Sequence, residues 1–235
     1  MRLVILKSLL LALAVPQQLD YCGNVAYMRG EKIGSGGTAD GVYRAELGDS
    51  RRGVFKFGRS GTAHELLDNE CQILRQMKDK GVENVPRCVA QCDDGLLLVP
   101  QFNAGVDTVS TLTAESIRDT VSRHAAISKL MMTLAQSVLS ASVASSDIQL
   151  LANSRTGDLL VIDFDHAVSW ANRPFTYLDA TLVRSNVQEM LNLMDPQDVA
   201  FARESLAVAM AAIGPERAAS AAALDVLKNY LPLMD

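Results

Sequence analysis

The order of local patterns along the chain constrains the fold more than any single motif does. Short apolar runs punctuated by glycines fill residues 25–103, whereas helical periodicity dominates from Leu112 to about Val143 and again from Asp179 onward. A single β-hairpin, residues 148–164, separates the two helical stretches. A β-rich half followed by an α-rich half predicts an α+β fold with two lobes, not an alternating parallel sheet.

We therefore divide the chain into an N-terminal segment (1–24), a β-rich lobe (25–103) and a shortened helical lobe (104–235). In the β-rich lobe we expect a strand–loop–strand unit at 30–47, a short strand at 51–58, a helix at 62–81 and a buried strand ended by Pro100. Proline 196 and the Gly214–Pro215 pair are expected to break the last helical stretch.

Charge and cysteine content exclude some classes of protein. The chain carries 22 basic and 27 acidic residues, a net charge of −5, and it has no basic cluster that would follow a phosphate backbone. We therefore expect no nucleic-acid partner. The four cysteines, Cys22, Cys71, Cys88 and Cys92, are scattered, and this predicts small buried thiols in a reducing compartment and no disulfides.

The N-terminal segment has two interpretations. A basic start and the apolar stretch from Ser8 to Val15 are typical of a signal peptide, but Lys7 interrupts the apolar run and no small-x-small cleavage site follows. The alternative is a packing helix. In either case the run is too short to span a bilayer, so we expect no transmembrane span.

The stretch "IGSGGTADGVY" could bind an anion through its backbone. Glycines 34, 36 and 37 leave room for backbone N–H groups to reach a phosphate without side-chain obstruction. Glycine-rich hairpins that bind nothing are common, so this stretch alone does not decide the function.

A lysine and a glutamate point to a buried ion pair. Lysine 56 lies inside the apolar strand "VFKF", where its charge is costly unless something offsets it. Glutamate 70 lies on the helix face that carries Leu66 and Leu74, so it points toward the core. We expect the two side chains to pair. The alternatives are a lysine on an edge strand facing water and a glutamate at the rim of the helix.

Two aspartates flank the hairpin. Aspartate 147 precedes its first arm and Asp163 follows its second, so both lie at the same end of the hairpin. Paired carboxylates repel unless a cation lies between them, and hard divalent ions prefer oxygen ligands. This predicts a metal site. Capping of a following helix would explain Asp163 but not the pair.

Together these residues resemble the protein-kinase fold over roughly residues 25–170. The loop resembles the kinase Gly-rich loop, "NECQILRQM" resembles the helix that carries the paired glutamate, and "VIDFDHA" resembles the Asp-Phe-Gly metal motif with Asp165 in place of glycine. The resemblance implies binding of ATP and Mg²⁺. The implied nucleotide-binding residues are Ile33, Gly34, Ser35, Gly36, Gly37, Val42, Lys56, Glu70 and Val99, the last near the gatekeeper position.

The same resemblance assigns the chemistry. Lysine 56 would hold the phosphates, Asp163 would bind Mg²⁺, and Asp147 would orient the acceptor hydroxyl, bind metal, or do both. The chain lacks the His-Arg-Asp loop, carrying "VASSDIQLLAN" there, and it lacks an Ala-Pro-Glu motif. It is most similar to the minimal kinases that bacterial pathogens deliver into host cells by type III secretion, some of which have an Asp-Leu-Gln type strand.

That similarity implies a monomeric kinase that transfers the γ-phosphoryl of ATP to a hydroxyl of a protein, such as a host protein. A pseudokinase without turnover and a small-molecule phosphotransferase remain alternatives. Transfer of AMP in place of phosphate also stays open, because variants of this fold bind the nucleotide in a flipped orientation.

Overall fold

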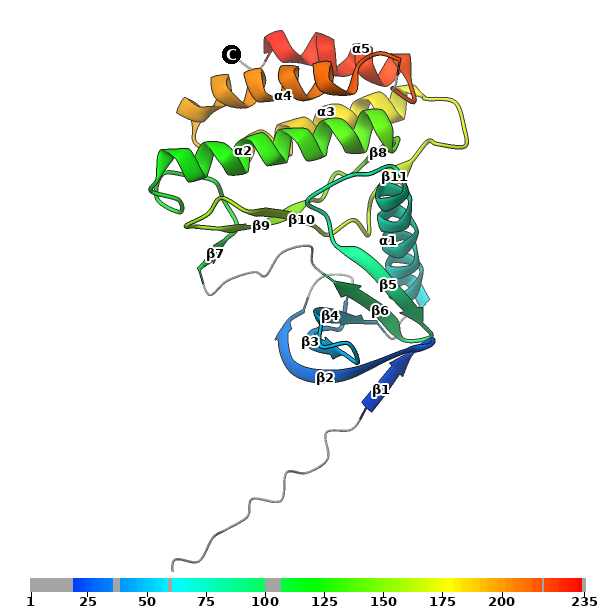
Figure 1. Cartoon of the computed structure of the whole chain (residues 1–235). Helices are drawn as coiled ribbons and strands as arrows, with labels where there is room; N and C mark the ends of the chain where they lie inside the picture. Colours follow the sequence, from blue (N-terminus) through cyan, green and yellow to red (C-terminus); the bar gives the residue numbers. More distant parts are fainter. Residues whose placement is uncertain (1–18, 36–38, 59–60, 100–106, 217, 234–235) are drawn as a thin grey trace, which may run out of the picture.

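The computed structural model describes residues 19–35, 39–58, 61–99, 107–216 and 218–233. The first lobe is a six-stranded antiparallel sheet in the order β1-β2-β3-β4-β6-β5, with one helix beside it (Figure 1). The elements are β1 (Leu19–Cys22), β2 (Val25–Gly34), β3 (Gly41–Leu47), β4 (Arg52–Phe57), α1 (Gly61–Asp79), β5 (Arg87–Cys92) and β6 (Gly95–Val99). Strands β2, β3, β4 and β6 and helix α1 match the expected elements. Strand β1, which falls within residues 1–24, and strand β5 were not foreseen.

The sheet buries both of its faces because side chains alternate along each strand. Leucines 96 and 98 belong to the main core with helix α1, whereas Leu97 belongs to a second cluster with Tyr27 and Phe55. Tyrosine 27 and Phe55 stack with ring centroids 5.1 Å apart. One sheet therefore supports two hydrophobic cores, one on each side.

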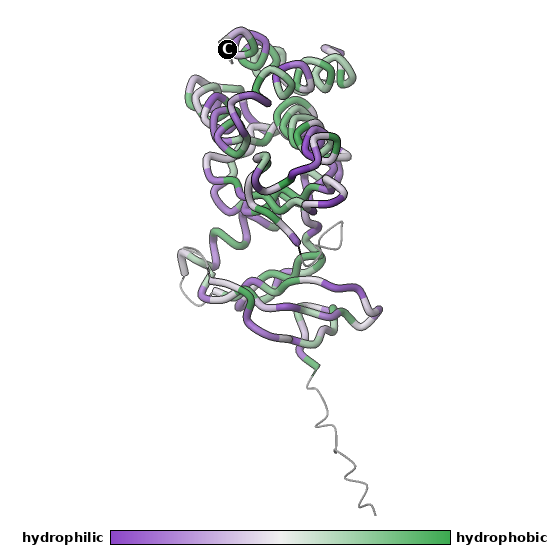
Figure 2. The backbone as a smooth tube through the Cα atoms, turned by 90° about the vertical axis from the view of Figure 1, so that its left-hand side faces the viewer, coloured by the Kyte–Doolittle hydropathy of each residue, from purple (hydrophilic) through white to green (hydrophobic). Residues whose placement is uncertain are grey.

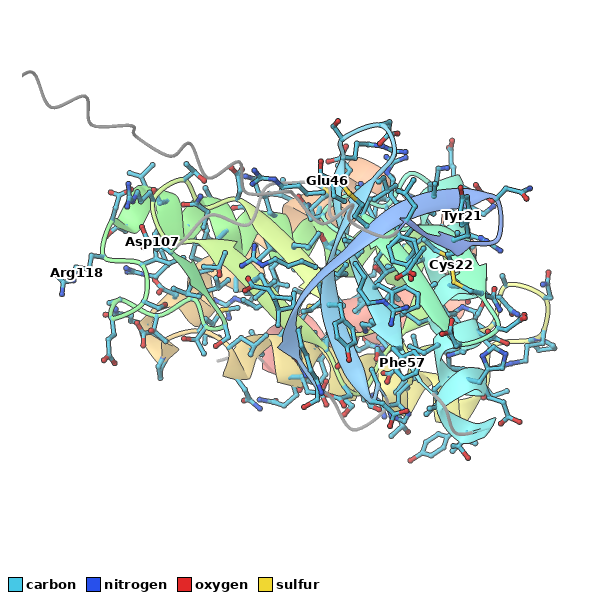
Figure 3. All side chains as sticks on the ribbon, turned by 90° about the horizontal axis from the view of Figure 1, so that it is seen from below. Tyr21, Cys22, Glu46, Phe57, Asp107 and Arg118 are labelled. Atoms are coloured by element: carbon cyan, nitrogen blue, oxygen red, sulfur yellow. A yellow bond between two sulfur atoms is a disulfide. The ribbon has the colours of Figure 1, made fainter. Side chains whose placement is uncertain are left out.

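Two disulfides tie this lobe together, so the prediction of free cysteines is wrong. Cysteine 22 is bonded to Cys92, and Cys71 is bonded to Cys88. Figure 3 shows the sulfur atoms beside Cys22, at the end of β1. The first bond joins β1 to β5, the first and last strands in the sheet order, so the curled sheet is covalently closed. The scatter of the cysteines in the sequence gave no sign of these pairings, which only the closure of the sheet and the packing of α1 create.

The second lobe is mainly helical (Figure 1). Its helices are α2 (Thr120–Ala135), a π-helical turn (Gln136–Ser140), α3 (Tyr177–Asn192), α4 (Val199–Ile213) and α5 (Ala221–Tyr230), with short 3-10 turns at Pro196–Asp198 and Leu231–Leu233. In Figure 2 hydrophobic and hydrophilic residues alternate along these helices, as expected for helices with one buried face. The breaks at Pro196 and Gly214 fall where the sequence predicts them.

Helix α2 begins later than expected. The prediction started the helix at Leu112, but α2 starts at Thr120, because the Asp119 carboxylate accepts from the N–H of Ser122 and caps it. Leucine 112 instead forms a bridge with Met194. Its apolar character reflects burial against the other helices, not membership of α2.

The hairpin between the helical stretches is present as predicted. Strands β9 (Gln149–Asn153) and β10 (Leu159–Ile162) pair antiparallel, with Gln149 opposite Ile162. Strand β7 (Thr108–Val109) extends this sheet, and β8 (Val143–Ala144) pairs with β11 (Val168–Ser169). The chain thus has the expected two-lobed α+β architecture. None of the helices among the described residues is long and apolar enough to cross a membrane.

Candidate functional site

Lysine 56 is directed away from the aromatic core of the first lobe by strand alternation. Its neighbours in β4, Phe55 and Phe57, lie on the aromatic side of the sheet. Lysine 56 lies on the other face, and its side chain is only 14% exposed. A buried ammonium group requires anionic partners, and the structure supplies two.

The first partner is Glu70 of helix α1. Lysine 56 Nζ donates to both carboxylate oxygens of Glu70, at 2.9 and 2.8 Å. The Glu70 side chain is 1% exposed and shares its helix face with Leu67 and Leu74, both buried. The structure therefore brings together the lysine and glutamate that the sequence pattern paired.

The second partner is Asp163, directly after strand β10. Lysine 56 Nζ lies 3.0 Å from Asp163 Oδ1, and Gln149 Nε2 donates to Asp163 Oδ2 at 3.1 Å. Aspartate 163 has a φ of 72°, in the left-handed region that residues other than glycine seldom occupy. Such strain is found where a side chain has to be held in a particular direction. Here the turn at the strand end directs the carboxylate toward Lys56.

Opposing effects set the protonation of this cluster. Burial disfavours the charged form of Lys56, but attraction to Glu70 and then to Asp163 outweighs it, so the pKa of Lys56 is raised. Burial raises the pKa of Glu70, and the Lys56 ammonium opposes that effect. We favour an ionised pair, because Lys56 contacts both oxygens of Glu70 and a lone buried charge would be costly.

Among the described residues, the Asp147 side chain makes no hydrogen bond to Lys56, Glu70 or Asp163. This side chain is exposed, and the backbone N–H and C=O of Asp147 contact the Ser145 hydroxyl. Within the described residues, Gln149 rather than Asp147 is the hairpin side chain that contacts Asp163. Glutamine 149 was not singled out from the sequence. Its place opposite Ile162, next to Asp163, is set by the hairpin register, which the sequence pattern did not determine.

Helix α3 holds the loop that carries Asp147. Asparagine 186 donates to the Ser145 carbonyl at 2.5 Å, and the backbone N–H of Ile148 donates to the Glu189 carboxylate. Burial and then the charge of Asp147 raise the pKa of Glu189. Glutamate 189 is therefore a second acid near Asp147 that the sequence analysis missed, because the two residues belong to distant segments.

The remaining predicted residues that the structure describes lie on or directly after strands β2, β3 and β6 of the same sheet. Valine 42 lies opposite Lys56 across β3 and β4, and Gly34 lies opposite Val42. Isoleucine 33 is 47% exposed at the end of β2 and Ser35 follows Gly34, while Val99 ends β6. Residues 36 and 37, both predicted to bind phosphate, lie outside the described residues.

The donor set fits a divalent cation bound together with phosphates. The Asp163 side chain, which is 25% exposed, offers two carboxylate oxygens, and the Gln149 carboxamide, whose Nε2 donates to Oδ2, carries an oxygen on the same group. Mg²⁺ typically takes one or two protein oxygens, with phosphate oxygens and water as the other ligands. The described residues hold no group of three His, Cys, Asp or Glu residues that could bind a metal without a substrate.

Two surface cavities lie elsewhere. One, of about 390 Å³, is lined mainly by the end of α1 and the residues after it, and the other, of about 290 Å³, by residues 140–142, 170–175 and 219–220 with Lys80. Neither is lined by Lys56, Glu70 or Asp163.

Comparison with known proteins supports the fold class. A crystal structure of a BubR1 kinase domain is similar over 94% of this chain and 89% of that chain, with a TM-score of 0.50 and 11% sequence identity. No family model and no curated protein matches the chain. The chain therefore has a protein-kinase-like bilobal fold, with Lys56, Glu70 and Asp163 gathered between its sheet and its hairpin.

Proposed function

We propose that the chain is an ATP- and Mg²⁺-dependent phosphotransferase that transfers the γ-phosphoryl group to a hydroxyl of a protein. The observation that carries this proposal is the Lys56–Glu70–Asp163 cluster in a kinase-like fold. A scaffold without nucleotide has no evident need for an inward-facing lysine with two carboxylates, which is costly to bury.

Each residue has a definite role in this proposal. Glutamate 70 orients Lys56, and Lys56 holds the phosphates of ATP. Asp163 and Gln149 hold Mg²⁺, which neutralises phosphate charge when bound. Aspartate 147 orients the acceptor hydroxyl and accepts its proton. Phosphoryl transfer depends mainly on positioning and charge neutralisation, so an exposed carboxylate is sufficient as the base.

Nucleotide binding and transfer are tested separately. Millimolar Mg-ATP should raise the melting temperature of the folded protein, because a ligand that binds only the native state stabilises it. Incubation of the protein with a eukaryotic lysate and ATP labelled on the γ-phosphate should then label protein. In a parallel incubation with ATP labelled on the α-phosphate, label transferred only from the α-phosphate would indicate AMP transfer. Label in small molecules would indicate a small-molecule phosphotransferase. The absence of a thermal shift with Mg-ATP would overturn the proposal.

A second candidate is a nucleotide-binding module without turnover. It is favoured by the exposed side chain of Asp147, which makes no hydrogen bond with Lys56 or Asp163 in the part of the chain that the structure describes. A Mg-ATP thermal shift without label transfer from either phosphate would support this candidate.

The resemblance to kinases delivered by type III secretion is the most specific part of the proposal. A delivered kinase would act in a reducing cytosol, whereas disulfides persist in oxidising compartments. The two disulfides are therefore the feature of this chain that fits delivery least, and the compartment in which the protein acts decides whether they remain formed.

A further inference from the structure

Three consecutive residues of helix α1 hold three different parts of the molecule. Asparagine 69 contacts the segment after Asp163, Glu70 contacts Lys56 of strand β4, and Cys71 is bonded to Cys88 of strand β5. The residue that orients Lys56 in the proposed function is thus flanked on both sides by residues that fix the helix.

The covalent contact lies directly beside Glu70. Cysteine 71 is fully buried, and its Cα lies 5.3 Å from that of Cys88. Because Cys71 adjoins Glu70 in the same helical turn, a shift of α1 relative to β5 would carry Glu70 with it. The bond therefore restricts how far the Glu70 carboxylate can move from Lys56.

The hydrogen bonds of Asn69 restrict the same helix from the other lobe. Its Nδ2 donates to the carbonyl oxygens of Asp165 and Ala167, at 2.8 and 2.9 Å. Further along α1, Gln76 Nε2 donates to the Ala141 carbonyl at 2.5 Å and to the Ser169 hydroxyl at 2.8 Å. Helix α1 is thus connected to the residues that follow Asp163 as well as to the sheet.

We infer that the Cys71–Cys88 disulfide, together with Asn69, positions Glu70 at Lys56 and makes phosphoryl transfer depend on the oxidised state of the chain. This inference rests on the proposed function. A dithiol such as dithiothreitol would supply two electrons and two protons: the S–S bond breaks, Cys71 and Cys88 become thiols, and the dithiol becomes a cyclic disulfide. Helix α1 would then be free to move from β5.

The chain provides a matched control in its other disulfide. The Cys22–Cys92 bond closes the sheet and spans 70 residues, whereas the Cys71–Cys88 bond spans 17. A disulfide that closes a longer loop removes more conformational entropy from the unfolded chain. Removal of Cys22–Cys92 should therefore lower the melting temperature more than removal of Cys71–Cys88. If Cys71–Cys88 positions Glu70, its removal should affect turnover more. The melting temperature should thus fall more when Cys22–Cys92 is removed, whereas turnover should fall more when Cys71–Cys88 is removed.

The experiment compares the double variants Cys71→Ala/Cys88→Ala and Cys22→Ala/Cys92→Ala in the full chain. At a temperature where both are folded, kcat of the first should fall about 10-fold or more, because misplacement by an ångström is costly, while the second stays within about twofold of wild type. Dithiothreitol should inactivate the wild type as Cys71 and Cys88 become alkylatable, and reoxidation should restore activity. The turnover of the first variant should not change with dithiothreitol. Wild-type turnover in the first variant would overturn the inference.

A readout that needs no turnover separates this inference from the proposed function. Amide hydrogen exchange at residues 69–72 should be faster in the first variant than in the second. If oxidised wild type transfers no phosphate, the proposed function fails, and hydrogen exchange still decides whether the disulfide fixes α1. If the first variant does not fold, Asn69→Leu keeps both disulfides and should lower kcat with little change in the KM for Mg-ATP. An unchanged kcat in that variant would count against the inference.

Discussion

Lysine 56 and Asp163 form an ion pair of 3.0 Å across 107 residues of sequence. Strand β4 sets the direction of the lysine, and the strained turn after β10 sets the direction of the aspartate. Since Glu70 holds the same ammonium group, one lysine joins the sheet, helix α1 and the hairpin of the second lobe. The two lobes therefore meet at the place where we expect the phosphates of ATP.

The first prediction concerns the coupling of Lys56 and Glu70. Lys56→Ala and Glu70→Ala should each reduce phosphoryl transfer strongly, and the double variant should lose much less than the sum, because the two residues act as a unit. We expect a coupling energy of about 1–3 kcal/mol from kcat/KM in a double-mutant cycle. The half-buried pair Lys129–Asp158, at 2.7 Å and remote from the Lys56 cluster, is the control and should show little coupling in kcat/KM. Additive losses at Lys56 and Glu70 would show that Glu70 does not orient the lysine.

The second prediction separates the roles of the residues around the hairpin end. Asp163→Ala should abolish transfer, because it removes the main metal ligand. Gln149→Ala should instead raise the Mg²⁺ concentration needed for half-maximal rate while keeping measurable turnover. Titration of the rate with Mg²⁺ measures both effects. A Gln149→Ala variant with an unchanged Mg²⁺ requirement would remove Gln149 from the metal site.

The third prediction concerns Asp147. Asparagine keeps an oxygen that can bind a cation but cannot accept a proton. If Asp147 is the base or orients the acceptor, Asp147→Asn should lower kcat about 10²-fold while the thermal shift with Mg-ATP persists. We expect this outcome, because Gln149 occupies the position next to Asp163. An Asp147→Ala variant with wild-type turnover would place the active site elsewhere.

The fourth prediction concerns the stability that each disulfide provides. The chain-entropy relation gives about 4.4 kcal/mol for a bond closing a 70-residue loop and about 3 kcal/mol for a 17-residue loop. Removal of Cys22–Cys92 should therefore lower the free energy of unfolding more than removal of Cys71–Cys88. Urea unfolding of the two double alanine variants at matched pH measures the difference. The reverse order would show that native-state packing, not loop length, determines the effect.

The fifth prediction concerns acid stability. The hydrogen bonds from Arg173, at 2.6 and 2.7 Å, hold the pKa of the buried Asp179 carboxyl well below its ordinary value of 3.8. A lowered folded-state pKa stabilises the fold above the unfolded pKa, and this stability is lost as pH falls toward the folded pKa. Asp179→Asn should cost about 1–2 kcal/mol at pH 7, a value reduced by the partial exposure of Arg173, and the difference from wild type should shrink below about pH 4.

Chemical denaturation between pH 2 and pH 7 checks this prediction. Asp49→Asn serves as the control, since the carboxyl of Asp49 also pairs with an arginine but is exposed. Hydrogen bonds from Arg51 also lower the pKa of Asp49, but exposure to solvent weakens that pair, so Asp49→Asn should change the pH dependence of unfolding much less than Asp179→Asn does. A difference between wild type and Asp179→Asn that persists undiminished at low pH would contradict the assignment.

Periodicity predicted the features of the fold that depend on neighbouring residues. The alternation around Lys56 and the helical spacing around Glu70 each fixed a side-chain direction, so their pairing could be expected. The hairpin followed from its polar turn and apolar arms. The Cys22–Cys92 bond could not be foreseen, because β1 and β5 become neighbours only when the sheet curls. The contact of Gln149 with Asp163 depended on the hairpin register, which the sequence left undetermined.

The closed sheet of the first lobe also bears on self-association. Unpaired N–H and C=O groups on edge strands are sites where another chain can add a strand and start aggregation. In this chain the two outermost strands, β1 and β5, are joined by Cys22–Cys92, so neither can separate from the other without breaking a covalent bond. Under reducing conditions β1 and β5 would keep their pairing with β2 and β6, but only noncovalent contacts would limit how far the two edges part. The bond therefore limits the exposure of the two edges that another copy of the chain could pair with.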